Sequence, residues 1–90
     1  MKILHVEDNS YDAEIIAACL AEAGLSCDIT RTQTSAEYQA LLEQPGWDLI
    51  LSDYALPSFN GISALRFAVK KCPEVPFIFV SGVLGEDIAV

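Results

Sequence analysis

The sequence predicts an α/β fold of three layers, in which a parallel sheet lies between helices. Apolar, β-favouring runs alternate along the chain with segments of helical periodicity, in the pattern β-α-β-α-β-α-β followed by the start of another helix. The polar, glycine and proline breaks fall between these segments. Such alternation is typical of parallel strands joined by right-handed helical crossovers.

Four segments are predicted to be strands. Residues 2–6, 49–51 and 77–80 are almost continuously apolar, which is typical of central strands covered on both faces. Residues 27–31 alternate between apolar and polar, which indicates a half-exposed edge strand. The simplest strand order is therefore 2-1-3-4. No charged residue protects the fourth strand, so we expect it to form an open edge through which two copies could pair as a homodimer.

The first two helices are predicted from their capping residues. Asn9 or Ser10 can cap the first helix, which is expected to stop at Gly24. The second helix spans about 34–43, because its first four residues match a capping box.

The third helix is predicted from its spacing, since one face carries Ile62, Leu65, Val69 and Cys72. It must end near Cys72, because the residue before a proline disfavours helical angles. Glu86 and Asp87 suit the first turn of a further helix. We expect Tyr38 and Trp47 to pack at the domain surface with their polar tips in water.

Length and charge limit the possible functions. A chain of 90 residues is at most one domain. Its formal net charge of −8 disfavours nucleic acid and anionic membrane surfaces as ligands, because both bind through Lys and Arg. The cysteines lack CxxC spacing, which favours reduced thiols, and no apolar run is long enough to span a membrane. We therefore expect a cytoplasmic protein.

Oxygen-bearing side chains stand where the predicted strands end. Glu7 and Asp8 follow the first strand, Asp53 ends the third, and Ser81 follows the fourth. The carboxyl ends of parallel strands meet at one edge of the sheet, where open α/β sheets bind their ligands. Clustered carboxylates must be protonated or bind a cation, and Mg²⁺ is typical of such oxygen ligands. A carboxylate beside Mg²⁺ is also a competent nucleophile toward phosphorus.

Each of these residues taken alone has an ordinary structural explanation. Glu7 and Asp8 could simply precede a helix, because acids favour helix N-termini. Asp53 could cap a loop, and Ser81 with Gly82 could form a turn. His5 lies inside an apolar strand and is expected to pack in the core.

Taken together, the residues resemble the receiver domain of two-component response regulators. Three segments carry the resemblance, which extends over the whole chain: residues 3–9 (ILHVEDN), residues 49–54 (LILSDY) with Leu56, Pro57 and Gly61, and residues 76–82 (PFIFVSG). The resemblance implies a flavodoxin-like fold. It also implies a phosphoacceptor module of phosphorelay signal transduction, which is a signalling domain and not an enzyme.

The resemblance further implies a role for each site residue. Asp53 would be the phosphoacceptor, receiving its phosphoryl group from a sensor histidine kinase or a phosphotransfer protein. Asp8 and Asp53 would ligate Mg²⁺ or Mn²⁺ directly, with Glu7 acting largely through water. The main-chain carbonyl of Ala55 would be a further metal ligand. Ser81 would be the switch hydroxyl.

The chain departs from the receiver pattern at its C-terminal end. A complete receiver has a fifth parallel strand carrying a lysine that pairs with the phosphoryl group, followed by a last helix. We expect residues 1–90 to be a receiver domain that lacks both. Residues 81–90 are similar to receivers joined to other signalling modules, so the parent protein could carry a histidine kinase module.

Three other classes of protein share features of this sequence pattern. A phosphorylation-independent interaction domain with the receiver fold is the main alternative. A haloacid-dehalogenase-like phosphatase would need a second acid where this chain has Ala55. A flavodoxin would bind phosphate in a loop that is acidic here, which disfavours it.

The absent lysine leads to a prediction about phosphoryl uptake. A lost charge-assisted contact costs about 1.5–3 kcal/mol, or roughly 10- to 100-fold in rate. We expect the 90-residue chain to take up phosphoryl groups from acetyl phosphate poorly, and a chain extended through the native fifth strand to take them up on Asp53. Mass spectrometry measures both. Equal uptake by the two chains would show that the lysine is dispensable.

Overall fold

The computed structural model describes residues 1–54, 61–80 and 88–89. No helix within this described part is long and apolar enough to cross a membrane. The elements in chain order are β1 (Lys2–Val6), α1 (Ser10–Glu22), β2 (Asp28–Thr32), α2 (Ser35–Leu42), β3 (Leu49–Asp53), α3 (Gly61–Lys71), β4 (Phe77–Val80) and β5 (Ile88–Ala89). All seven elements predicted before residue 81 are therefore present, with bounds shifted by only one or two residues.

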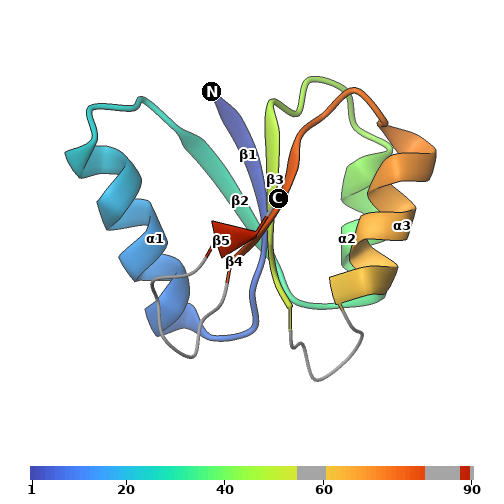
Figure 1. The fold of residues 1–90 in the computed structure, drawn as a ribbon, viewed down its shortest axis with the longest axis horizontal. Helices are drawn as coiled ribbons and strands as arrows, with labels where there is room; N and C mark the ends of the chain where they lie inside the picture. Colours follow the sequence, from blue (N-terminus) through green and yellow to red (C-terminus); the bar gives the residue numbers. More distant parts are fainter. Residues whose placement is uncertain (55–60, 81–87, 90) are drawn as a thin grey trace.

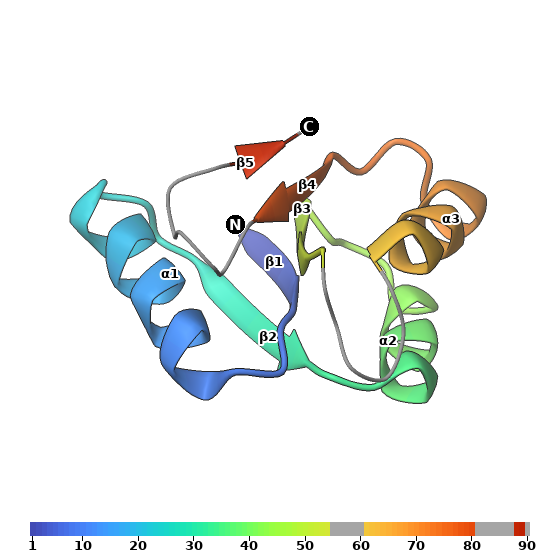
Figure 2. The ribbon, with the colours of Figure 1, turned by 60° about the horizontal axis from the view of Figure 1, so that its bottom comes forward.

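The strands form one sheet in the order β2-β1-β3-β4-β5, and the first four strands are parallel (Figure 2). This confirms the predicted order 2-1-3-4. It also confirms that the alternating strand, β2, lies at an edge, while the apolar β1 and β3 are central.

The expectation of an open edge at the fourth strand is wrong. Residues of β5 pair antiparallel with β4, so that Phe79 lies opposite Ala89 and Val80 opposite Ile88. Ile88 and Ala89 are therefore strand residues, and the helix expected to start at 86 does not include them. The reason is that β5 supplies partners for backbone groups that an unpaired edge would leave exposed.

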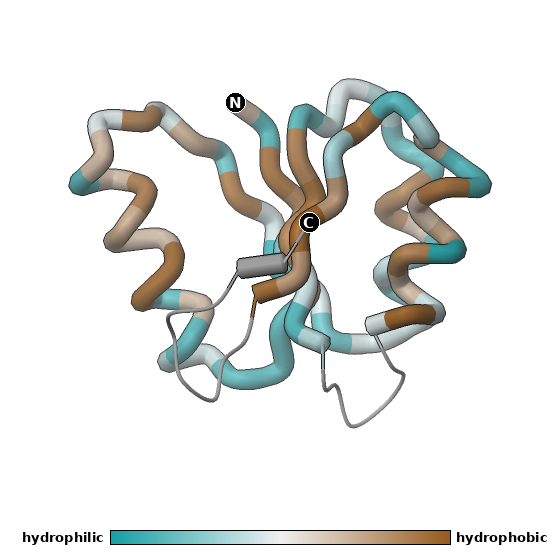
Figure 3. Tube along the Cα trace, viewed as in Figure 1, coloured by the Kyte–Doolittle hydropathy of each residue, from teal (hydrophilic) through white to brown (hydrophobic). Residues whose placement is uncertain are grey.

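Helices cover both faces of the sheet, with α1 on one face and α2 and α3 on the other (Figure 1). Along the strands the apolar residues dominate the colouring between these layers (Figure 3). The α1 face is built around Ile3, Leu51 and Val80. The core on the α2/α3 face is larger, and its buried members are Leu4, Val6, Tyr38, Leu42, Trp47, Ile50, Ala64, Ala68 and Cys72.

The ends of α1 are fixed by local hydrogen bonds. Asn9 is the N-cap, and its Oδ1 accepts hydrogen bonds from the backbone N–H groups of Tyr11 at 2.9 Å and Asp12 at 3.1 Å. The helix stops before Gly24, which has φ 79°. Backbone bonds from Gly24 N to Ala21 O and from Leu25 N to Leu20 O complete a Schellman motif.

The predicted capping box of α2 is only half made. Thr34 Oγ1 accepts a hydrogen bond from Glu37 N at 3.2 Å, as expected of an N-cap. The Glu37 carboxylate instead accepts a hydrogen bond from the hydroxyl of buried Thr32. Glu37 thereby links the start of α2 to the end of β2.

Tyr38 and Trp47 do not lie at the surface with wet polar tips, contrary to expectation. Both are buried. The Tyr38 hydroxyl donates a hydrogen bond to Ala64 O at 2.7 Å, and Trp47 Nε1 donates to Leu41 O at 2.9 Å. Because main-chain carbonyls replace water as acceptors, both rings can be placed in the core.

The Tyr38 hydroxyl joins α2 to α3, which gives a prediction about stability. Removing it by Tyr38→Phe leaves Ala64 O without this donor, so the free energy of unfolding should fall by about 1–2 kcal/mol. Urea unfolding measures the change. Tyr11→Phe is the control, because Tyr11 is exposed. An equal effect of both substitutions would show that the buried bond contributes nothing.

Candidate functional site

The register of two neighbouring strands brings two acids together. In the β1–β3 pair, His5 lies opposite Leu51 and Val6 opposite Ser52. One step further along this register, Glu7 lies next to Asp53. Alternation along each strand puts Glu7 and Asp53 on the face that α1 covers, which Ile3 and Leu51 also occupy.

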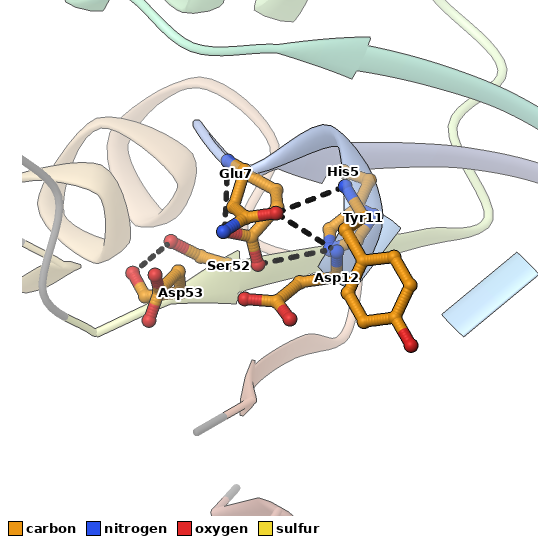
Figure 4. A network of polar contacts seen from close by, with 7 residues as sticks. His5, Glu7, Tyr11, Asp12, Ser52 and Asp53 are labelled. Atoms are coloured by element: carbon orange, nitrogen blue, oxygen red, sulfur yellow. Dashed lines mark hydrogen bonds and ion pairs between the residues drawn. The ribbon is translucent and has the colours of Figure 1, made fainter. Parts of the chain in front are cut away.

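One carboxylate oxygen from each of Glu7, Asp8 and Asp53 lies within 4.8 Å of the other two. The three acids differ in exposure: Glu7 is buried, Asp53 is half-buried and Asp8 is exposed. Figure 4 shows Glu7 and Asp53 extending from neighbouring strands into the same region. The expected meeting of the three carboxylates at this edge is therefore present in the fold.

The surroundings of Glu7 disfavour its ionised form. Burial raises the pKa of Glu7 to about 7, against a backbone hydrogen bond that lowers it. That bond runs from Asn9 N to Glu7 Oε2 at 3.3 Å. The neighbouring charges of Asp53, Asp12 and Asp8 raise the pKa further. Without a cation, burial and the neighbouring negative charges therefore disfavour the ionised form of Glu7.

His5 lies on the same face, two residues before Glu7. Its expected place in the core is confirmed, with an exposed fraction of 1%. Its Nε2 lies 4.0 Å from Glu7 Oε1, which is too long for a hydrogen bond (Figure 4). Burial, with the nearby charge of Arg31, lowers the pKa of His5 to about 4, so the imidazole is neutral at pH 7.

Gly61 holds the first turn of α3 close to the end of β3. Its N–H donates a hydrogen bond to Tyr54 O at 3.0 Å. A Cβ at this position would lie 2.7 Å from the Phe79 ring and 3.0 Å from the Tyr54 backbone. Only glycine allows this approach, which anchors the residue that follows Asp53.

Two of the predicted site residues, Ala55 and Ser81, lie outside the described residues. Conversely, sequence reasoning assigned no site role to His5 or Asn9, both of which lie beside Glu7. The alternation of a strand was a usable signal for His5, because residues two apart share a face.

The arrangement has a clear chemical capacity. Three carboxylates of graded exposure offer several oxygen ligands at the carboxyl ends of two central strands. Oxygen-only donor sets of this kind suit hard divalent cations such as Mg²⁺ and Mn²⁺. A half-buried carboxylate beside such a cation can also act as a nucleophile.

The burial of Glu7 predicts a pH dependence of stability. Its pKa in the folded protein, about 7, exceeds its ordinary value of 4.5, so between these pH values the folded state binds a proton that the unfolded state has lost. The contribution of Glu7 to the free energy of unfolding therefore falls as the pH rises from about 4.5 to about 7. Glu7→Gln removes the effect, so the variant should gain roughly 1–3 kcal/mol on wild type between about pH 5 and about pH 8.

Urea unfolding in EDTA at the two pH values measures this gain. The His5 contribution is present in both proteins, so comparing the variant with wild type isolates Glu7. Glu22→Gln, which changes an exposed glutamate at the end of α1, is the control. A difference between Glu7→Gln and wild type that does not change with pH would contradict the raised pKa.

Comparison with known proteins agrees with this geometry. NtrC of Escherichia coli K12, a DNA-binding transcriptional regulator, is 31% identical over 85 residues, which cover 94% of this chain and 18% of NtrC. The receiver domain of the sensor histidine kinase PA1611 from Pseudomonas aeruginosa PAO1, whose structure holds a magnesium ion in its active site cleft, has a TM-score of 0.75. It is 30% identical, with 89% of this chain and 66% of that chain covered.

A further structure comes from Saccharomyces cerevisiae and joins the histidine phosphotransfer protein Ypd1 to the receiver domain of the response regulator Ssk1. It matches with a TM-score of 0.61 and 25% identity over 90% of this chain and 61% of that chain. This chain therefore spans about a fifth of NtrC and about two thirds of the solved chains. The family of response regulator receiver domains matches residues 3–90. The chain belongs to the response regulator receiver domain family.

Proposed function

We propose that this chain is a phosphoacceptor module that receives a phosphoryl group on Asp53 in a two-component phosphorelay. The observation that carries the proposal is the cluster of Glu7, Asp8 and Asp53 within 4.8 Å in a chain of the receiver family. The half-buried position of Asp53 supports its role as nucleophile, because the carboxylate is reachable and partly desolvated.

Mg²⁺ or Mn²⁺ is the cation we propose for the cluster. Asp8 and Asp53 would hold it directly, Glu7 through water, and the Ala55 carbonyl would add a ligand. The bound ion would neutralise the oxygens of the transferring phosphoryl group. The magnesium ion of the PA1611 receiver supports this choice.

The protein residues then carry the transfer. A carboxylate oxygen of Asp53 forms the new bond to phosphorus as the phosphorus–nitrogen bond of a phosphohistidine breaks, and the donor histidine takes up a proton. Asp8 and Glu7 supply the charge that holds the cation beside Asp53. Ser81 is proposed to hydrogen-bond the product as the switch hydroxyl.

The proposed partner is a sensor histidine kinase or a phosphotransfer protein. The Ypd1–Ssk1 complex, in which a receiver domain meets a histidine phosphotransfer protein, supports this class. The cytoplasmic location expected from the sequence belongs to the same proposal. Pairing of two copies through the edge of β4 is not part of it, because β5 pairs with Phe79 and Val80 on that edge.

Acetyl phosphate with Mg²⁺ tests the proposal by intact-mass spectrometry. Wild type should slowly gain one phosphoryl group, in line with the poor uptake expected from the sequence; peptide mapping should place it on Asp53, and EDTA should abolish the gain. Asp53→Asn should gain none and so defines the baseline for slow uptake. Asp28→Asn, an exposed acid at the start of β2, should behave as wild type.

Two outcomes would contradict the proposal. Uptake that persists in Asp53→Asn would place the acceptor elsewhere. Binding of Mg²⁺ with no uptake, even by a longer chain that includes the parallel, lysine-bearing strand implied by the receiver resemblance, would favour the phosphorylation-independent interaction domain.

A further inference from the structure

The imidazole of His5 presents a buried polar atom with no hydrogen bond. Among the described residues, His5 Nε2 is the one buried side-chain nitrogen or oxygen that lacks a hydrogen-bond partner. An unpaired buried polar atom destabilises the folded state, so a histidine at this core position needs a physical reason. The carboxyl group of Glu7 lies on the same face, with its Oε1 4.0 Å from this nitrogen.

The two oxygens of Glu7 lie in different surroundings. Oε2 accepts a hydrogen bond from Asn9 N at 3.3 Å, while Oε1 faces His5 Nε2 (Figure 4). A shift of about 1 Å would bring the nitrogen to hydrogen-bond distance. Each carboxylate oxygen has two lone pairs. The two Glu7 oxygens can therefore accept the hydrogen bonds from Asn9 N and His5 Nε2, and each still has a lone pair for a further bond in the metal site.

We propose that His5 is a positioning residue for the metal site: its Nε2–H donates to Glu7 Oε1 in the cation-loaded protein and fixes this carboxylate toward Asp8 and Asp53. This inference rests on the proposed function, because it needs a cation in the cluster. The donation requires no change in the charge of His5, since a neutral imidazole carries one N–H. Partners of this kind orient metal-binding side chains and hold them in place.

Strand geometry explains why this position is suited to the task. His5 and Glu7 lie two residues apart on a central strand with parallel neighbours on both sides, so their backbones are fixed relative to each other. The imidazole is enclosed, with an exposed fraction of 1%, so water does not compete for its nitrogen.

Two substitutions of His5 test the proposal. His5→Leu keeps the volume and removes the N–H, whereas His5→Gln keeps an N–H donor at a similar distance from the backbone. Calorimetry with Mg²⁺ and electron paramagnetic resonance with Mn²⁺ measure the affinities. His5→Leu should lower the affinity for both ions by about tenfold or more. His5→Gln should retain most of the wild-type affinity.

A double-mutant cycle with Glu7→Gln separates positioning from packing. In the Glu7→Gln background, His5→Leu should cause no further loss of metal affinity, because the carboxylate that His5 positions is gone. An equal loss in both backgrounds would overturn the proposal, and so would a loss of affinity that His5→Gln does not restore. If wild type binds Mg²⁺ and His5→Leu binds it equally well, His5 has no such role and the proposed function stands. If wild type binds neither ion, both fail.

The wild-type protein offers a check that needs no variant. Long-range ¹H–¹⁵N NMR of the His5 ring during a Mg²⁺ titration should show the neutral tautomer with the proton on Nε2, and its resonances should shift with metal occupancy. A ring whose signals do not respond to saturating Mg²⁺ would overturn the proposal even if His5→Leu failed to fold.

Discussion

The parallel register between β1 and β3 is the constraint on which the rest of this molecule depends. His5 lies opposite Leu51 and Val6 opposite Ser52. This register necessarily brings the acids at the carboxyl ends of the two strands close together. The same pairing builds the centre of the sheet, so the charge cluster cannot be relieved by separating the strands without losing the core. The repulsion must be met by protonation, by hydrogen bonding or by a cation.

The three acids differ in exposure, and they therefore suit different roles in the site. Asp8 is exposed and reachable, Asp53 is half-buried, and Glu7 is enclosed beside His5. Burial makes the ionised form of Glu7 costly, which is why its pKa rises to about 7. A bound cation would reverse that cost, so the metal and the folded state are coupled through this residue.

Much of this fold could be predicted from the sequence because its signals are local. Apolar runs marked the strands, Asn9 and Thr34 capped their helices, and Gly24 ended α1. The wrong predictions concern residues whose structure depends on contacts with residues far away in the sequence. The hydrogen bond to Ala64 O allows the Tyr38 hydroxyl to be buried, and backbone pairing with β4 makes Ile88–Ala89 a strand. The meeting of the acids was predictable from topology, whereas the surroundings of Glu7 depend on distances that a sequence does not contain.

The most direct test of the charge cluster is the free energy of unfolding of wild type, Asp8→Asn and Asp53→Asn, measured in EDTA and then in Mg²⁺. In EDTA both variants should be more stable than wild type by about 1–2 kcal/mol, because each relieves repulsion. Mg²⁺ should stabilise wild type and have much less effect on the variants, while Asp28→Asn should follow wild type throughout. If both variants are clearly less stable than wild type in EDTA, and Mg²⁺ changes nothing, the three carboxylates do not form a strained cation site.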